Sequence, residues 1–184
     1  MGEYYLISQL PSLDGWSESA PVPITEERFL ELCTQSLGKK ALAELKNLSL
    51  IPGRIPEKSA SGLVQAWNEG ERNLRLALGK IRADKMNKPF LCENTSLPIG
   101  LVQAARTAAD TESPLDAERF LLRYRLDFLE TLRPMDGFSE DFLFYYLLKL
   151  KLISRIKQFD AERGEAAYKC IYRSLMSEGR SEVM

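Results

Sequence analysis

Residues 59–86, SASGLVQAWNEGERNLRLALGKIRADKM, decide the fold of this chain. Apolar side chains recur along this stretch at the i, i+3, i+4, i+7 spacing of an amphipathic helix. They form one stripe, which consists of Leu63, Trp67, Gly70, Leu74, Ala77, Leu78 and Ile81. Burying a large apolar side chain contributes roughly 1.5–3 kcal/mol, so the stripe gains most by packing against other elements. The pattern therefore predicts a central helix over 59–86, around which the rest of the chain is organised.

Before the central helix, the sequence predicts an N-terminal arm over residues 1–24 and a helical hairpin over residues 25–48. Residues 1–24 begin with an aromatic and β-branched run, 3–10, which fits either a short strand or a helical turn. The rest of this arm is rich in proline and serine, which is typical of a loop. Thr25 is suited to cap a helix, and Gly38 divides the segment 25–48 into two helices.

The remaining helices are expected within residues 97–177. One is predicted over 97–109, and a second starts at Ser113, where a cap is followed by proline and aspartate, and runs to about residue 132. Ser139 caps the last long helix, whose apolar pattern continues to about residue 175. Gly164 leaves open whether this is one helix or two. The expected fold of residues 1–184 is thus all-α, one domain of six or seven helices, with at most a short N-terminal strand.

Composition narrows the possible functions. The 184 residues carry a formal net charge of −1, which argues against a general nucleic-acid binder because such proteins need a basic surface. No apolar run approaches the roughly 20 residues that span a bilayer, and residues 1–10 lack the pattern of a signal peptide. The three cysteines are widely spaced, so we expect buried, reduced thiols in a cytoplasmic protein.

The chain offers no recognisable catalytic, cofactor-binding or metal-binding residues. It contains no histidine, which excludes Ser-His and Cys-His nucleophilic catalysis within the chain. Glu69 and Glu71 are two residues apart and therefore point to different sides of a helix. No glycine-rich phosphate loop is present, because Gly70 and Gly79 fall within a helical pattern and no GKS or GKT occurs.

Residues 142–150, FLFYYLLKL, are apolar almost all round. A helix of this kind is either central to a core or covered by a second protein. If the run is not core, it is the first candidate for a partner surface, for which we single out Phe142, Phe144, Tyr145 and Leu147. Arg125 lies inside an apolar stripe of an earlier helix; it is expected to be paired or to extend to solvent, with a partner contact as the alternative.

Residues 67–80, WNEGERNLRLALGK, resemble the recurring helix of the helical cap protein of V/A-type rotary ATPases, the component designated C or d. The matching positions are Glu71, Arg72, Asn73, Leu74, Arg75, Gly79 and Lys80. Most of the chain is also similar to a family of short bacterial proteins encoded alongside V-type ATPase subunits. The segments that carry this second likeness are 3–13, 23–33, 123–132 and 145–164.

The resemblance implies a non-catalytic structural subunit or accessory of a V/A-type ATPase, and hence a part in proton or ion transport. In that family the cap protein joins the central stalk to the membrane rotor ring, so these are the implied partners. The chain would then lie at the cytoplasmic side and meet the membrane only through the complex. Within the motif, Glu71, Asn73 and Arg75 are interpreted as anchors where helices cross, together with Arg72 and Lys80, and only secondly as partner contacts.

Two other functions remain open from the sequence. One is a general helical adaptor for protein–protein interactions, unrelated to the ATPase. The other is a carboxylate- or metal-dependent enzyme, which would require a deep polar pocket with clustered Asp and Glu side chains.

Overall fold

The computed structural model describes residues 2–18, 20–53, 59–90, 97–159, 164–165 and 167–173. These residues form eight helices and no strand, which confirms the all-α prediction. Seven helices have defined bounds: α1 (Gly2–Gln9), α2 (Glu26–Ser36), α3 (Lys39–Lys46), α4 (Gly62–Lys85), α5 (Ile99–Asp110), α6 (Pro114–Thr131) and α7 (Glu140–Lys157). The eighth is made of the helical residues after 163. The expected number of six or seven helices was therefore too low.

The N-terminal run is a helix and not a strand. Helix α1 buries Leu6 and Ile7 while Tyr4 and Tyr5 remain exposed. A strand here would leave its backbone groups without partners, since the described residues contain no other strand to pair with. A helix satisfies these groups within itself, which explains why the helical alternative prevails.

Helix α4 occupies nearly the predicted span. Its first turn is capped by Ser61, whose Oγ accepts a hydrogen bond from the backbone N–H of Val64 at 3.3 Å. Trp67 and Leu74 are fully buried, and Ile81 is partly buried. Gly70 lies against the ring of Phe128 on α6, and a Cβ at this position would come within 2.4 Å of the ring. The glycine therefore leaves room for the Phe128 ring of α6 to pack against α4.

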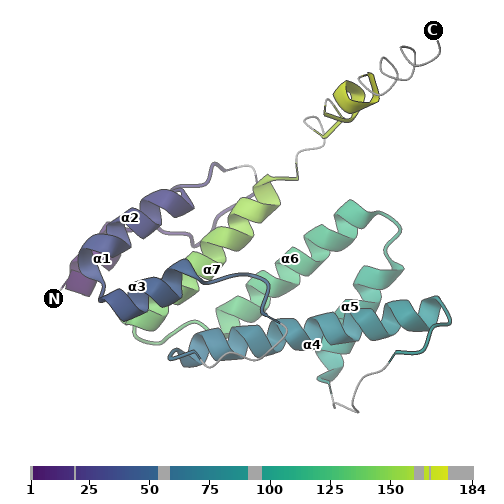
Figure 1. Cartoon of the computed structure of the whole chain (residues 1–184), viewed down its shortest axis with the longest axis horizontal. Coiled ribbons are helices and arrows are strands. Elements are labelled where there is room, and N and C mark those ends of the chain that lie inside the picture. The colour runs from purple at the N-terminus through teal and green to yellow at the C-terminus, as the bar shows by residue number, and fades with distance from the viewer. Residues whose placement is uncertain are drawn as a thin grey trace, which may run out of the picture.

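The buried apolar side chains collect in two clusters, and α4 and α6 contribute to both. The larger cluster surrounds α7, which contacts α2, α3, α4 and α6 (Figure 1). The smaller cluster lies where α4, α5 and α6 meet, with Leu74, Ala105 and Leu121 among its buried members. The small alanine side chains of α5 permit its close packing on α4.

The run 142–150 belongs to the core and is not a partner surface. Residues 143–150 are all buried, including the proposed surface residues Phe144, Tyr145 and Leu147, and Phe142 packs on the same cluster. The reason is that α7 has helices on several sides, so an all-round apolar segment is fully covered by its own chain.

The C-terminal part and the cysteines agree only in part with what the sequence predicts. Helix α7 ends at Lys157, and helical residues resume at 164–165, while residues 160–163 lie outside the described part. Cys33 is buried, which raises the pKa of its thiol to about 12. Cys170 is exposed, contrary to the expectation, and Cys92 lies outside the described residues. None of the described helices combines the length and the apolar character needed to cross a membrane.

Candidate functional site

A buried carboxylate on α4 is the centre of the first polar network. The side chain of Glu71 is only 3% exposed. Its Oε2 accepts a hydrogen bond from Nε of Arg125 at 2.9 Å, and its Oε1 accepts one from Nη2 of the same residue at 2.9 Å. Oε1 also accepts a hydrogen bond from Nε of Arg75 at 3.0 Å. A single carboxylate is thus held by two guanidinium groups, one of them in a bidentate arrangement.

The local sequence explains how this network forms. Glu71 lies on α4 between the buried Trp67 and Leu74, one turn from each, so the helix carries it toward the interior. Arg125 lies on the inner side of α6 and reaches it from the opposite helix. Burial alone would lower the pKa of Arg125, but its hydrogen bonds to Glu71 outweigh this effect and raise it. The arginine therefore remains charged, and the ion pair ties α4 to α6.

A second ion pair extends this network to α7. Arg155 donates from Nε and Nη2 to Oε1 of Glu118 at 3.1 and 2.9 Å, which links α7 to α6. Both residues line a cleft of about 50 Å³ together with Glu71, Arg75 and Arg125. We call these five residues the Glu71 network.

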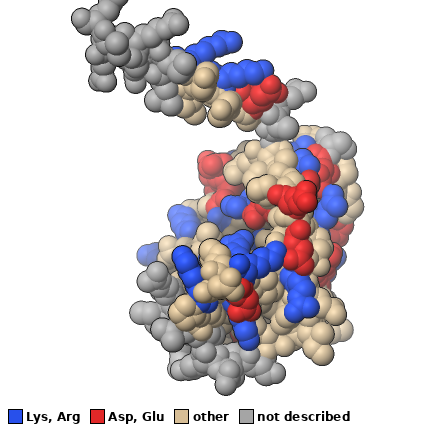
Figure 2. Space-filling view, turned by 90° about the vertical axis from the view of Figure 1, so that its right-hand side faces the viewer, with Lys and Arg blue, Asp and Glu red and all other residues tan. Residues whose placement is uncertain are grey.

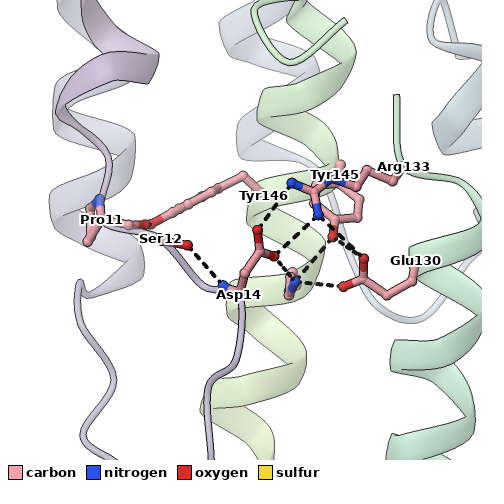
Figure 3. A network of polar contacts seen from close by, with 8 residues as sticks. Pro11, Ser12, Asp14, Glu130, Arg133, Tyr145 and Tyr146 are labelled. Atoms are coloured by element: carbon pink, nitrogen blue, oxygen red, sulfur yellow. Dashed lines mark hydrogen bonds and ion pairs between the residues drawn. The ribbon is translucent and has the colours of Figure 1, made fainter. Parts of the chain in front are cut away.

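The second polar network is centred on a lysine. Lys149 lies on α7, and its side chain is only 9% exposed. Its Nζ donates to Oδ1 of Asp14 at 2.8 Å and to Oε1 of Glu130 at 2.6 Å (Figure 3). It also lies 3.2 Å from the hydroxyl of Tyr145, which in turn donates to Oε2 of Glu130 at 2.8 Å. Arg133 closes the group by donating to Asp14 at 3.1 Å. We call these residues the Lys149 network.

The pKa values in the Lys149 network reflect its hydrogen bonds. The hydrogen bond from Lys149 lowers the pKa of Asp14. Partial burial would raise the pKa of Glu130, but the hydrogen bonds from Lys149 and Tyr145 outweigh it and lower the value. Burial would likewise lower the pKa of Lys149, yet its bonds to the two carboxylates raise it. The lysine and both carboxylates are therefore charged at neutral pH, and together with Arg133 their charges sum to zero.

The structure separates the motif residues that the sequence grouped. Glu71 and Arg75 meet at the crossing of α4 and α6, together with Arg125. Within the described residues, Arg72 donates a hydrogen bond to the backbone oxygen of Gly53, at 3.5 Å.

The other two motif residues lie apart from the crossing. Asn73 is partly exposed, and its side chain makes no hydrogen bond within the described part of the chain. Lys80 is exposed, one helical turn before the basic end of α4.

The Lys149 network was not foreseen from the sequence. One signal was present, because Lys149 is the single charge in the apolar run 142–150. A charge in a buried helix requires a partner of opposite sign. The partner Asp14 lies 135 residues earlier in a loop, where no periodicity identifies it.

Both networks can hold helices in place, and their charged groups are mostly committed to one another. Within the described residues, no group of three or more Cys, Asp or Glu side chains is placed to hold a metal ion. On the face shown in Figure 2, basic and acidic side chains are interspersed. No family model matches the chain, and neither the curated proteins nor the solved structures compared with it gave a match.

Proposed function

We propose that this chain is a non-catalytic structural subunit or accessory of a V/A-type rotary ATPase, a connector between the central stalk and the membrane rotor like the helical cap protein. The observation that carries the proposal is the position of Glu71, the first of the matching positions in the motif that resembles the helix of that cap protein. It is buried at a helix crossing and bound by Arg125 from another helix. The motif thus supplies an internal brace, as expected for a part whose role is mechanical.

The distribution of charges supports the same proposal. The buried charged side chains in the described part of the chain, Glu71 and Lys149, are each bound by groups of opposite charge. In contrast, two other motif cations lie outside the Glu71 network: Arg72 is partly exposed and Lys80 is exposed. A rigid helical body with an exposed basic helix surface can contact acidic surfaces of neighbouring subunits without performing a reaction.

A binding experiment with purified components tests the proposal. The tagged full-length chain is mixed with V/A-type ATPase stalk and ring subunits from the organism that encodes it, and complexes are isolated by size-exclusion chromatography. We expect a stoichiometric complex with at least one stalk or ring component. Failure to bind any of these subunits, with the chain folded, contradicts the proposal.

Two charge-reversal substitutions test whether α4 is the surface that contacts the partner. Lys80→Glu changes an exposed motif cation on α4, and Arg106→Glu makes the same change on the exposed side of α5. If the motif helix contacts the partner, Lys80→Glu weakens the complex at least tenfold while Arg106→Glu changes it less than threefold. Equal effects of both substitutions would mean that α4 is not the contact surface.

A further inference from the structure

The cleft of the Glu71 network lies where α4, α6 and α7 meet. Three arginines line it, one from each helix: Arg75, Arg125 and Arg155. The cleft measures about 50 Å³, which exceeds the roughly 10–15 Å³ needed to hold one water molecule. A carboxylate group can therefore enter it in place of a few waters.

Two of these arginines have hydrogen-bond donors to spare. A guanidinium carries five N–H groups. Arg75 uses its Nε on Glu71, and Arg155 uses its Nε and Nη2 on Glu118. No hydrogen bond in the described part of the chain uses the Nη groups of Arg75 or the Nη1 group of Arg155. Their side chains are 44% and 46% exposed, respectively, so these donors can meet a ligand that arrives from solvent.

The charged groups that line the cleft carry a net positive charge, which favours the binding of one further anion. Three guanidinium groups face two carboxylates, those of Glu71 and Glu118, which leaves a net charge of +1. Glu71 already accepts three hydrogen bonds, one from Arg75 and two from Arg125. One additional negative charge would neutralise the cleft, and planar guanidinium groups match a carboxylate geometrically.

The rest of the wall is aliphatic. Leu122 and Leu152 are buried beside the arginines, and Leu50 and Ile51 form the remaining side. A ligand that brings only an oxyanion would leave these side chains without contacts. A ligand that brings a short hydrocarbon stem behind its charge would use both parts of the cleft.

We propose that this cleft binds a monoanionic carboxylate carried on a short aliphatic stem. The stem can belong to a free short-chain acid or to a glutamate side chain of another protein, and both present the same chemistry. The proposal concerns the cleft alone and does not rest on the ATPase assembly, so the two can fail separately.

Arginine-detected NMR titration of the full-length chain tests the proposal. The probes are butyrate, N-acetyl-glutamate amide and inorganic phosphate, at constant ionic strength. We expect saturable shifts of the Nε–H signals of Arg75 and Arg155 with at least one carboxylate probe. Preference for butyrate identifies a free acid as the ligand, and preference for the glutamate derivative identifies a protein side chain. Absence of saturable shifts with both, or tighter binding of phosphate, overturns the proposal.

Substitutions with a matched control locate the binding. Arg75→Gln and Arg155→Gln should each weaken carboxylate binding at least tenfold, and Arg75→Lys should also weaken it because the planar fork is lost. Arg72→Gln removes a neighbouring arginine that does not line the cleft and should change binding less than twofold. Two cleft variants are used so that one poorly folded protein does not decide the result. Unchanged affinity in the folded cleft variants, or an equal loss in Arg72→Gln, overturns the assignment.

Discussion

Each of the two polar networks pairs one buried charge with groups of opposite charge, but the buried charge is negative in one and positive in the other. In the Glu71 network the anion is buried, and Arg125, which binds it, is nearly as inaccessible. In the Lys149 network the cation is buried, but its carboxylate partners lie at the rim, with Asp14 53% and Glu130 41% exposed. Water can replace a lost partner at an exposed carboxylate, but it cannot readily do so at a buried arginine. The two networks should therefore differ in what their removal costs.

The two networks also join different kinds of element. The bond between Glu71 and Arg125 joins two long helices whose bonded residues are 54 positions apart. The bond between Lys149 and Asp14 joins a helix to a loop 135 positions away. The first network fixes the distance between α4 and α6, whereas the second holds a connecting segment on the core.

The largest expected effect is that of Glu71→Ala. It leaves the charge of Arg125 buried without its hydrogen-bonded partner, and breaking a buried ion pair in this way costs about 3–5 kcal/mol. Urea denaturation of the purified variants, followed by circular dichroism, measures the loss in free energy of unfolding.

A double variant provides the control for this prediction. Adding Arg125→Leu to Glu71→Ala removes the stranded charge, so part of the lost stability should return. If Glu71→Ala costs less than about 1 kcal/mol, a range ordinary for exposed pairs, the Glu71 network does not brace the crossing of α4 and α6.

A smaller effect is expected for Lys149→Met. The substitution keeps the volume of the buried side chain and releases two carboxylates that are already partly solvated. Hydrogen bonds to charged groups contribute about 1.5–3 kcal/mol. Solvent screening at Asp14 and Glu130 reduces this contribution, and we expect a loss of about 1–2 kcal/mol at pH 7 in the same denaturation experiment. A loss as large as that of Glu71→Ala would remove the contrast between the two networks.

The Lys149 network also predicts a dependence on pH. The pKa values of Asp14 and Glu130 are lowered in the folded protein from ordinary values of 3.8 and 4.5. Their contribution is therefore complete above those ordinary values and is lost as the pH falls through the lower folded values. The wild type should lose stability between about pH 5 and pH 2 more steeply than Lys149→Met. Equal slopes would show that these carboxylates are not stabilised by the lysine.

The sequence was most informative where periodicity and burial coincide. The stripe of α4 from Leu63 to Leu78 and the cap-and-proline start of α6 at Ser113 follow from side-chain spacing and capping alone. Spacing also places Glu71 beside the stripe, within reach of a neighbouring helix. It does not identify Arg125 as the partner, because the pairing depends on how α4 and α6 cross.

Other features required the three-dimensional structure. The run 142–150 reads equally well as core or as a covered interface, and only the packing of neighbouring helices on α7 decides in favour of core. Asp14 lies in an irregular loop with no pattern that marks it as a partner of Lys149. The number of helices was underestimated because the short run of α1 has no strong helical period.

The smallest effect is expected for Asn73→Leu. Asn73 neighbours the crossing in sequence, but its side chain is partly exposed and makes no hydrogen bond within the described residues. Substitutions away from buried features usually change stability by less than about 0.5 kcal/mol, and the melting temperature should hardly change. Asn68→Leu, at another partly exposed asparagine of α4, controls for the added apolar surface.

The stability of the Asn73→Leu variant shows whether Asn73 anchors the helix crossing or is available for contact with a partner. A loss above about 1.5 kcal/mol in Asn73→Leu alone would exceed the surface range and make this residue an anchor like Glu71. Stability retained in both asparagine variants would contradict the anchoring role that the sequence assigned to Asn73. Bracing would then rest on Glu71 with Arg75, and Asn73 would be free for contact with a partner. A loss of partner binding in Asn73→Leu, with stability unchanged, would establish that second role.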